Sequence, residues 1–423
     1  MLFERGIDII DRHMTDAEDV ADIIIAGSGL SGMTCALALQ PPAIKGDPRL
    51  VLIGAAAPDS GSPDLRALAI TRSSQRMFEA MGVWKDIAAR AEPLREILVS
   101  DSLPGDNQAP TLLHWEYSGD PGEVSAHFIE ADDLHRVLTE RVTKSTARWV
   151  KAQIRRIEHD RGLATVETTE GDRLRARLVI AADGKDSLCR RAAGIEIIRH
   201  DYAQLGLVAT LDHQLPHGGR AHEFFLPGGP FALLPLKGRR SSIVWTENDE
   251  VAQAILSGGA ERFMDELRKR AGDHLGAMTL AKGPQAFPLS LCVAEAFARQ
   301  RTALIGDAAH VIHPLAGLGF NLAMRDIAAL AEVVIEHARL GLDFGSEATL
   351  ELYARRRRVD TLMNAAAPDL LNRLFSNDRE GLRMVRDFGL RLVDRLPILK
   401  DLLMREAAGL TGDLPKLMQG ETI

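Results

Sequence analysis

The sequence contains little cysteine and no long apolar run. Its 423 residues include three cysteines, Cys35, Cys189 and Cys292, which lie far apart and match neither a disulfide framework nor a metal-ligand spacing. No stretch approaches the roughly 18 consecutive apolar residues that a membrane-spanning helix needs. Residues 1–20 carry eight charged side chains where a signal peptide would have its apolar core. These absences predict a cytoplasmic protein, either free or peripheral on the inner membrane.

Basic residues are in the minority. The 51 Lys and Arg residues against 59 Asp and Glu residues give a net charge of -8, which argues against a general nucleic-acid-binding protein. Hydrophobic residues make up 46% and charged residues 26% of the chain, as in ordinary soluble globular proteins. The length is sufficient for two or three domains with a large core.

The first ordered unit is "ADIIIAGSGLSGMTCALALQPP". A short buried strand precedes Gly27, Gly29 and Gly32 at G-x-G-x-x-G spacing, and a helix is predicted to run to about Gln40. In a dinucleotide site the first glycine makes the turn, the second lets the backbone approach a pyrophosphate, and the third allows close helix–strand packing. Glycine-rich turns also serve tight packing alone, but the strand before and the helix after favour a phosphate site.

The second strand lacks the acidic residue that dinucleotide-binding folds place at its end. A carboxylate there bonds the adenosine ribose, whereas the strand "RLVLIG" ends at Gly54. A charge-assisted hydrogen bond contributes about 1.5–3 kcal/mol. We therefore predict that the protein loses its dinucleotide readily, and that Gly54→Glu tightens binding by about 1–2 kcal/mol.

A second motif follows the buried strand at residues 178–181. Asp183-Gly184 turns the chain, and Ser187 and Arg190 complete a D-G-x-x-S-x-x-R spacing. Taken alone, this motif equally fits a strand, a turn and a helix whose N-terminus Ser187 caps.

A third motif stands in "IGDAAHVIHPLAGLGFNLAMRD". A short strand at residues 302–305 leads into Gly306-Asp307, small residues follow, and a long helix then begins. The three motifs together indicate a nucleotide-binding protein far more specifically than any one of them.

In this order and at these separations, the motifs resemble the class A FAD-dependent aromatic monooxygenases of the para-hydroxybenzoate hydroxylase fold. Three segments narrow the resemblance to the ubiquinone-biosynthesis hydroxylases of the UbiH/UbiF type: "HPLAGLGFNLAMRDIAALAEVV", "HEFFLPGGPFALLPLKGRRSSIVWT" and "ELYARRRRVDTLMNAAAPDLLNRLFSND". The resemblance covers essentially residues 20 to 415.

The resemblance implies an α/β fold. We expect a Rossmann-like FAD-binding domain of the glutathione-reductase type, an inserted antiparallel-sheet substrate domain and a C-terminal helical segment. The predicted division is an N-terminal extension at 1–20, a discontinuous FAD-binding domain at 21–98, 128–194 and 286–345, a substrate-binding sheet at 99–127 and 195–285, and the helical segment at 346–423.

The resemblance also assigns residues to FAD. Asp307 would hold a ribityl hydroxyl, and the helix that begins near Gly319 would point backbone N–H groups at the flavin, whose reduced form is anionic. Arg66 resembles the arginine that reaches the flavin pocket, although an exposed surface arginine is the alternative. The cofactor-binding residues expected are Gly27, Gly29, Gly32, Arg66, Asp183, Gly184, Asp307, Gly317, Gly319, Phe320 and Asn321.

His313 and Pro314 are the candidate catalytic residues on the reactive side of the flavin. A structural role for His313 is equally open. His310 and His313 are three residues apart, but they have no carboxylate or thiol companion in the segment, so we expect no metal site.

Two further positions depart from the family pattern. Relatives usually carry Arg or Asn where this chain has Ala131, and the ubiquinone-pathway relatives usually carry glutamine where it has Leu318. With Gly54, these departures put the affinity for FAD in question.

The activity that the resemblance implies is hydroxylation of the aromatic ring of a polyprenylated phenol on the way to ubiquinone, through a flavin C4a-hydroperoxide. FAD, O2 and a reductant, NAD(P)H or another donor, would be required. The apolar "GPFALLPL" would face the substrate ring. Two alternatives stay open: a flavin hydroxylase of another small aromatic substrate, and a non-catalytic or weakly flavin-binding member of a ubiquinone-biosynthesis assembly.

The last 73 residues differ in charge from the rest. Residues 351–423 hold 13 basic and 11 acidic side chains, and apolar residues recur at near-heptad spacing between 385 and 403. An amphipathic helix pair packed on the body explains this pattern. The alternative is a surface that docks on a membrane or on partners of a ubiquinone-biosynthesis complex. Whether the chain forms a homo-oligomer is left open.

Overall fold

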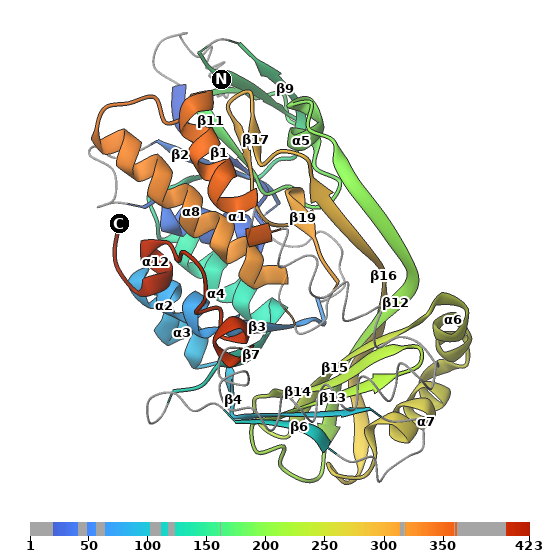
Figure 1. The fold of residues 1–423 in the computed structure, drawn as a ribbon. Helices are drawn as coiled ribbons and strands as arrows, with labels where there is room; N and C mark the ends of the chain where they lie inside the picture. The colour runs from blue at the N-terminus through green and yellow to red at the C-terminus, as the bar shows by residue number, and fades with distance from the viewer. Residues whose placement is uncertain are drawn as a thin grey trace, which may run out of the picture.

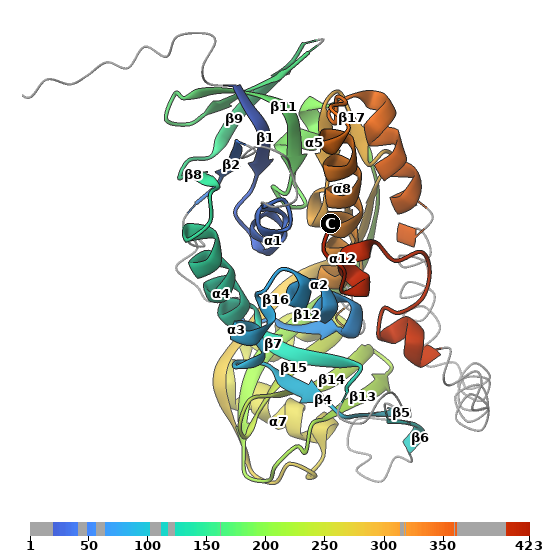
Figure 2. The same cartoon turned by 90° about the vertical axis from the view of Figure 1, so that its left-hand side faces the viewer.

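The computed structural model describes residues 20–40, 49–55, 64–101, 111–116, 123–160, 162–313, 317, 319–358, 360–361 and 403–423. Within these residues the strands form two eight-stranded sheets and one three-stranded sheet, with helices packed against them (Figures 1 and 2). The predicted α/β fold is confirmed.

The first sheet is built on the N-terminal strand. β1 (Val20–Ala26) pairs in parallel with β2 (Leu50–Ile53) on one side and β11 (Arg173–Ala181) on the other. β2 and the C-terminal halves of β1 and β11 are apolar and buried, because helices and neighbouring segments cover them. The sheet is completed by β8 (Arg148–Val150), β18 (Thr302–Leu304), β17 (Ala298–Arg299) and the hairpin of β9 (Ile154–His159) and β10 (Ala164–Thr168).

Three helices pack beside one another against this sheet. α1 (Leu30–Ala38) contacts both α4 (Ala131–Thr143) and α8 (Gly319–Arg339) (Figure 2). Fifteen of the 21 residues of α8 are buried. A helix with so little exposed surface is a central element of the core, and its first turn is held firmly.

A small antiparallel sheet connects the two larger ones. β3 (Ala67–Thr71) and β4 (Glu92–Leu94) both pair with β7 (Ala126–Glu130). α2 (Arg72–Ala80) follows β3 directly, and α3 (Trp84–Ala88) follows α2.

The second large sheet has the order β19-β16-β12-β15-β14-β13-β5-β6. Its longest strands, β12 (Ile197–His213) and β16 (Met278–Ala294), have 17 residues each and run from one large sheet to the other (Figure 1). The other strands are β5 (Glu96–Asp101), β6 (Thr111–Glu116), β13 (Arg220–Leu226), β14 (Gly229–Leu236), β15 (Arg240–Asn248) and β19 (His310–Val311).

The two faces of this second sheet pack differently. α6 (Asp249–Ser257) and α7 (Gly259–Ala271) cover one face, where Phe231, Trp245 and Phe263 share a core cluster. The opposite face, here called the inner face, packs in part on β3 and β7 through a cluster that includes Ala69, Phe128, Ala221 and Leu236.

The predicted domain boundaries stay a prediction. The predicted substrate region at 195–285 contains all of β12 to β15, but its limit at residue 285 falls inside β16. β5 begins at Glu96, three residues before the predicted limit of 99, and joins the second sheet.

Residues 403–423 pack on α2 and α8. Arg325 of α8 donates to the carbonyls of Gly409, at 3.0 Å, and Thr411, at 3.2 Å. The backbone N–H of Lys416, which opens the short helix α12 (Lys416–Gln419), donates to Glu332 of α8 at 2.8 Å. The near-heptad stripe lies outside the described residues except for Leu403. No helix in the described part of the chain is long and apolar enough to span a membrane.

Candidate active site

The three glycines after β1 occupy three different environments. Gly27 has φ +110°, and a Cβ there would lie 2.2 Å from the carbonyl oxygen of Ala182, at the end of β11. A Cβ on Gly32 would lie 1.8 Å from the carbonyl oxygen of Gly27, whereas a Cβ on Gly29 would have nothing within 4 Å. The first and third glycines are therefore required by packing, and the second leaves open space in front of the backbone. This is the arrangement that a bound pyrophosphate needs.

The start of α1 faces that open space. Its N-cap residue is Gly29, which has no side chain to cap the helix, and the first turn contains no acidic residue. The unpaired N–H groups and the dipole of a helix N-terminus favour an anion at this point.

Gly54 is explained by packing. A Cβ at this position would lie 2.6 Å from the backbone nitrogen and 2.4 Å from Oγ of Ser28, inside the glycine loop. Ser28 Oγ also donates to the Ala55 carbonyl at 2.5 Å. A glutamate at 54 would have to displace the Ser28 backbone that shapes the phosphate site. This steric constraint, set by a loop 26 residues earlier, argues against the prediction that Gly54→Glu tightens binding, and the affinity itself stays a prediction.

The Gly306-Asp307 turn lies where α1 and α8 meet. It forms the 3-10 helix η1 (Gly306–Ala308), with Gly306 at φ +57°. A Cβ on Gly306 would lie 2.7 Å from Ser31 Oγ of α1 and 3.3 Å from Ala323 Cβ of α8. Asp307 is exposed, so its carboxylate is available to a ligand.

Arg66 lies on the rim of the same opening. Its guanidinium donates to Asp64 at 2.7–3.1 Å and remains half exposed. The hydrogen bond to Asp64 is the main cause that raises the pKa of Arg66, and the charge on Asp307 adds to it. Arg66 and Asp307 therefore lie close enough to interact electrostatically. The carbonyl of Arg66 accepts a hydrogen bond from the N–H of Ala131 at 2.9 Å. Ala131 is one of the positions at which the sequence departs from the family pattern.

The D-G-x-x-S-x-x-R motif braces the Gly306-Asp307 turn. Asp183 accepts hydrogen bonds from Ser187 Oγ at 2.5 Å and from the Cys189 N–H at 3.0 Å. Ser187 caps α5 (Leu188–Ala192), as the capping alternative predicted. Buried Arg190 donates to the carbonyl of Ala308 in η1 at 2.9 Å. The protein thus occupies both Asp183 oxygens, and direct contact of Asp183 or Gly184 with FAD stays a prediction.

A buried ionic group beneath η1 was not anticipated from the sequence. Asp326 of α8 accepts from the Gly306 N–H at 2.9 Å, from His310 Nε2 at 2.6 Å and from Arg357 Nε at 2.6 Å. Burial alone would raise the pKa of Asp326, but the charges on His310 and Arg357 hold it below its ordinary value. His310 therefore has a carboxylate partner outside its own segment, and its hydrogen bond to Asp326 helps to hold the Gly306-Asp307 turn. One indication of this buried group was present in the sequence: Arg325 and Asp326 are two charged residues in the middle of the apolar run "NLAMRDIAAL".

Asn321 holds the first turn of α8 through its side chain. Its Oδ1 accepts from the N–H and Oγ1 of Thr71 and from Ser74 Oγ at 2.8–3.1 Å, and its Nδ2 donates to the Ala69 carbonyl at 2.7 Å. A Cβ on Gly317, which has φ +64°, would lie 3.4 Å from Ala69 Cβ, while Gly319 has open space. The side chain of Asn321 is thus a clamp, and backbone contact of Gly317, Gly319, Phe320 and Asn321 with the flavin stays a prediction.

His313 is buried. Its ring lies edge-on to that of Tyr202 in β12, with the ring centroids 5.2 Å apart. Pro314 and Leu318 lie outside the described residues. A catalytic role for His313 and Pro314 stays a prediction.

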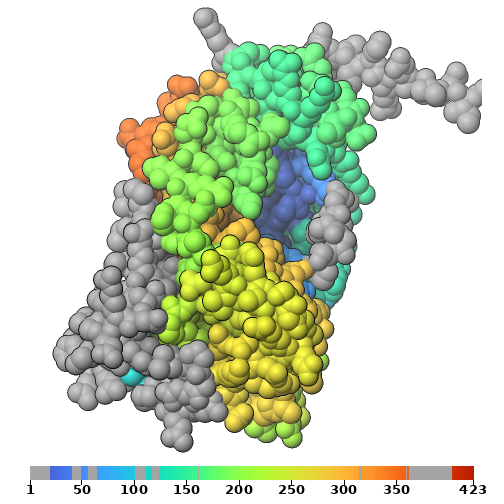
Figure 3. Space-filling view, turned by 90° about the vertical axis from the view of Figure 1, so that its right-hand side faces the viewer, coloured from blue at the N-terminus to red at the C-terminus, as the bar shows by residue number. Residues whose placement is uncertain are grey.

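The parts of this site meet in one place. Figure 3 shows a hollow on this face of the molecule with atoms of the N-terminal part of the chain (dark blue) at its floor. The open Gly29, the N-terminus of α1 and the exposed carboxylate of Asp307 fit the pyrophosphate and the polyol of FAD.

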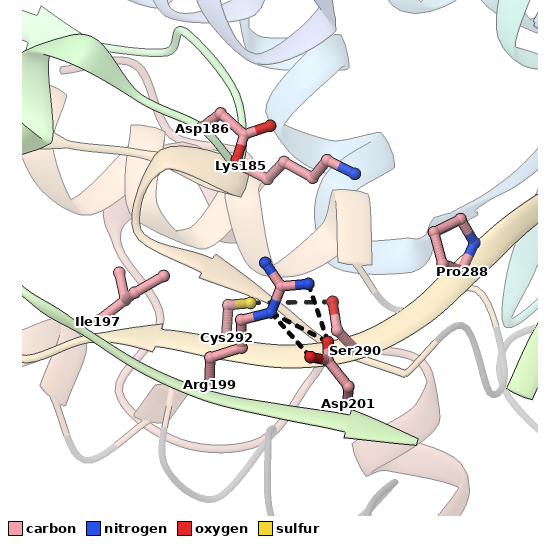
Figure 4. A pocket seen from close by; sticks show the side chains of 8 residues that line it. All are labelled: Lys185, Asp186, Ile197, Arg199, Asp201, Pro288, Ser290 and Cys292. Carbon is pink, nitrogen blue, oxygen red and sulfur yellow. Dashed lines mark hydrogen bonds and ion pairs between the residues drawn. The ribbon is translucent and has the colours of Figure 1, made fainter. Parts of the chain in front are cut away.

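A separate small pocket lies between the start of β12, the C-terminal end of β16 and the loop after Asp183 (Figure 4). Its volume is about 40 Å³, which accommodates water but no aromatic ring. Arg199 and Asp201 on its wall are hydrogen-bonded to each other at 2.9 and 3.2 Å, so their charges are paired. The pocket adds nothing to the cofactor site.

Comparisons with known proteins agree with this geometry. A family model described as an FAD binding domain matches residues 20–363. Ubiquinone hydroxylase UbiL of Rhodospirillum rubrum is 38% identical over 412 residues, which cover 96% of this chain and 94% of that protein. The 3-demethoxyubiquinol 3-hydroxylase of Escherichia coli K12 is 31% identical, over 92% of this chain and 98% of its own. The p-nitrophenol 4-monooxygenase PnpA from Pseudomonas putida DLL-E4 shares the fold, with a TM-score of 0.78 and 19% identity over 93% of this chain and 98% of that one.

Proposed function

Since the chain belongs to the FAD-dependent monooxygenase family of the ubiquinone-biosynthesis hydroxylases, we propose that it hydroxylates the aromatic ring of a polyprenylated phenol on the way to ubiquinone. It is an FAD-dependent aromatic-ring hydroxylase. The observation that carries the proposal is the juxtaposition of the FAD cradle with an apolar sheet face, joined through β3.

FAD supplies the activation of O2, with NAD(P)H or another donor as reductant. The chain's own share begins with binding: the open backbone at Gly29 and the N-terminus of α1 would hold the pyrophosphate, and Asp307 would accept a hydrogen bond from the ribityl chain. The N-terminus of α8, fixed by Asn321, would stabilise negative charge on the flavin by its dipole and N–H groups. No side chain needs to act as a nucleophile.

The substrate side is apolar. Ala232 and Leu234 of "GPFALLPL" lie on the inner face with Val208, Val244 and Phe287 of the neighbouring strands, in matching register. Phe287 is 39% exposed and Val244 is half-buried, so this surface is available for contact. Such a surface favours a greasy phenol over a carboxylated one.

A polyprenyl tail resides in a membrane, so we include a location in the proposal. The protein would be cytoplasmic and peripheral on the inner membrane, with the segment after residue 346 as the docking surface for the membrane or for partners in a ubiquinone-biosynthesis complex. Binding to vesicles with and without residues 362–402 tests this part.

The test of the function starts with the absorbance spectrum of the purified protein, which reports bound flavin. The FAD-loaded protein is then given a reductant, O2 and either a detergent-solubilised polyprenylphenol or the same phenol without its tail. We expect the tailed phenol to gain one oxygen atom, detected by mass spectrometry. Turnover of only the tail-less phenol would favour another small aromatic substrate, and a protein that binds no flavin would favour the non-catalytic assembly member.

A further inference from the structure

Glu223 is placed on the inner face by the alternation of β13. Its neighbours His222 and Phe224 point to the other face: the His222 ring lies 4.0 Å from that of His274, just after α7, and Phe224 packs on the core cluster under α6 and α7. Successive side chains of a strand point to opposite faces. Glu223 therefore points the same way as Ala221, toward the FAD-binding part of the molecule.

The row of residues to which Glu223 belongs is otherwise uncharged. Strand pairing aligns one residue from each of seven neighbouring strands on this face: Leu113, Val99, Glu223, Ala232, Val244, Val208 and Gln285. Glu223 is the only acidic or basic member of this row. The charged residues nearby on the inner face, Arg240 and Lys282, both pair with Glu130 of β7, at 3.0 and 2.7 Å.

Glu223 lies two residues along β13 from Ala221, which packs near the segment predicted to face the flavin. Ala221, two residues before it, shares a cluster with Ala69 of β3. Ala69 in turn accepts from Asn321 at the start of α8 and faces Gly317. Two residues along a strand correspond to about 7 Å, so Glu223 lies about that far along β13 from Ala221, which packs in the cluster with Ala69.

The carboxylate has no compensating partner among the described residues. Burial raises the pKa of Glu223 to about 7, with no hydrogen bond or neighbouring charge acting against it. Glu223 is still partly accessible, so a ligand on the inner face can reach its side chain. A buried polar group is normally hydrogen-bonded in the functional state of a protein.

We propose that Glu223 is the general base that accepts the proton of the substrate's phenolic hydroxyl. The phenol O–H bond breaks, an O–H bond forms on the Glu223 carboxylate, and the electron pair stays on the phenol oxygen. The negative charge enriches the ring, which then attacks an electrophilic oxygen more readily, and the proton returns to the hydroxylated product. This inference rests on the proposed function, because it requires a phenol on the inner face.

The experiment compares FAD-loaded wild type, Glu223→Gln and Glu223→Asp. Glu96→Gln, which removes from the neighbouring strand β5 a half-buried carboxylate that pairs with Arg220, is the matched control. We expect Glu223→Gln to lower kcat about 100-fold or more, Glu223→Asp to retain part of the activity, and Glu96→Gln to match the wild type. FAD affinity, measured by titration of apoprotein, should be unchanged in all four.

The pH profile and the acidity of the substrate separate a base from a structural group. The kcat of the wild type should rise with pH through about 7, as Glu223 loses its proton, and this limb should be missing in Glu223→Gln. The defect of Glu223→Gln should shrink at least tenfold for a ring-fluorinated phenol, whose hydroxyl ionises with less help.

Each outcome decides the assignment. Wild-type kcat in Glu223→Gln, an equal defect on both phenols or a loss of FAD affinity would overturn the role of Glu223. The wild type alone tests the proposed function: if it hydroxylates only a tail-less phenol, the variants are compared on that phenol. A wild type that holds FAD and hydroxylates no phenol overturns both.

Discussion

The cofactor end of this molecule and the inner face of its second sheet are built on opposite rules. Around Gly306 most of the buried polar groups pair with one another: Asp326 alone accepts three hydrogen bonds, and Arg190 and Asn321 bridge separate segments. On the inner face a single carboxylate, Glu223, stands unpaired in an uncharged row. At the cofactor end the protein supplies most of the partners of its buried polar groups, whereas Glu223 on the inner face has no partner among the described residues.

The largest effect is expected from removing Asp326, which accepts three hydrogen bonds at the cofactor end. Asp326→Ala leaves His310 buried without its acceptor and Arg357 with Asp360 alone, so we expect a loss of about 3–5 kcal/mol in the free energy of unfolding and weaker FAD binding. Denaturant unfolding of the apoprotein measures the first effect. Glu351→Ala, which removes a surface pair with Arg355, is the control and should cost about 0.5 kcal/mol or less. Equal stability of Asp326→Ala and wild type would refute the network.

Gly29→Val should separate cofactor binding from folding. The added Cβ has no protein atom within 4 Å and the side chain fills the space in front of the backbone, so FAD should bind at least about 100-fold more weakly, about 3 kcal/mol, with a nearly unchanged Tm. Gly32→Val, whose Cβ would strike the Gly27 carbonyl, should lower Tm instead. A yellow Gly29→Val protein with full FAD occupancy would contradict the assignment of the phosphate site to this loop.

Asp307→Ala tests the polar contact to the ribityl chain. Since Asp307 is exposed in the unliganded protein, the fold should be unaffected. The loss of a charge-assisted hydrogen bond, about 1.5–3 kcal/mol, should raise the Kd for FAD about 10- to 100-fold. Fluorescence titration of flavin into apoprotein measures it, and an unchanged Kd would contradict the assignment.

Substitutions at Gly54 test the steric constraint that Ser28 places on this position. Gly54→Ala and Gly54→Glu both add a Cβ against Ser28, and we expect each to cost about 1–3 kcal/mol of stability and to weaken FAD binding. The alanine variant isolates the steric part. Tighter FAD binding by Gly54→Glu than by wild type would restore the ribose interpretation.

The smallest expected effect concerns the inner face. In the folded protein Glu223 has a pKa of about 7, well above its value in an unfolded chain, so its contribution to stability is present at low pH and is lost as the pH rises through 7. Glu223→Gln removes that loss. The variant should therefore have a Tm about 2–4 °C above wild type at pH 8 and near that of wild type at pH 4. A Tm that shifts equally at both values would show that Glu223 is already neutral or solvated.

The same contrast explains how far the sequence could predict the molecule. Gly27 and Gly32 were identifiable because close approach of backbones requires glycine there, and Gly29 was identifiable from its place in the G-x-G-x-x-G spacing. The clamp at Asn321 and the acceptor at Asp326 could not be placed, because their partners lie up to 252 residues away in the chain. Glu223 has no motif at all: its position is defined by six strand pairings that only the assembled sheet establishes.

Residues 403–423 pack on α8, the helix whose start is predicted to face the flavin. Arg325, next to Asp326 in α8, is held by the carbonyls of Gly409 and Thr411, while Gly27 and Gly29 lie near the other end of the chain. During synthesis the glycine loop leaves the ribosome long before the residues that fix α8 exist. The two halves of the cofactor site are therefore joined late by contacts of very long sequence separation, which are slow to form. Free flavin in the cell can then act as a folding ligand that captures the finished site.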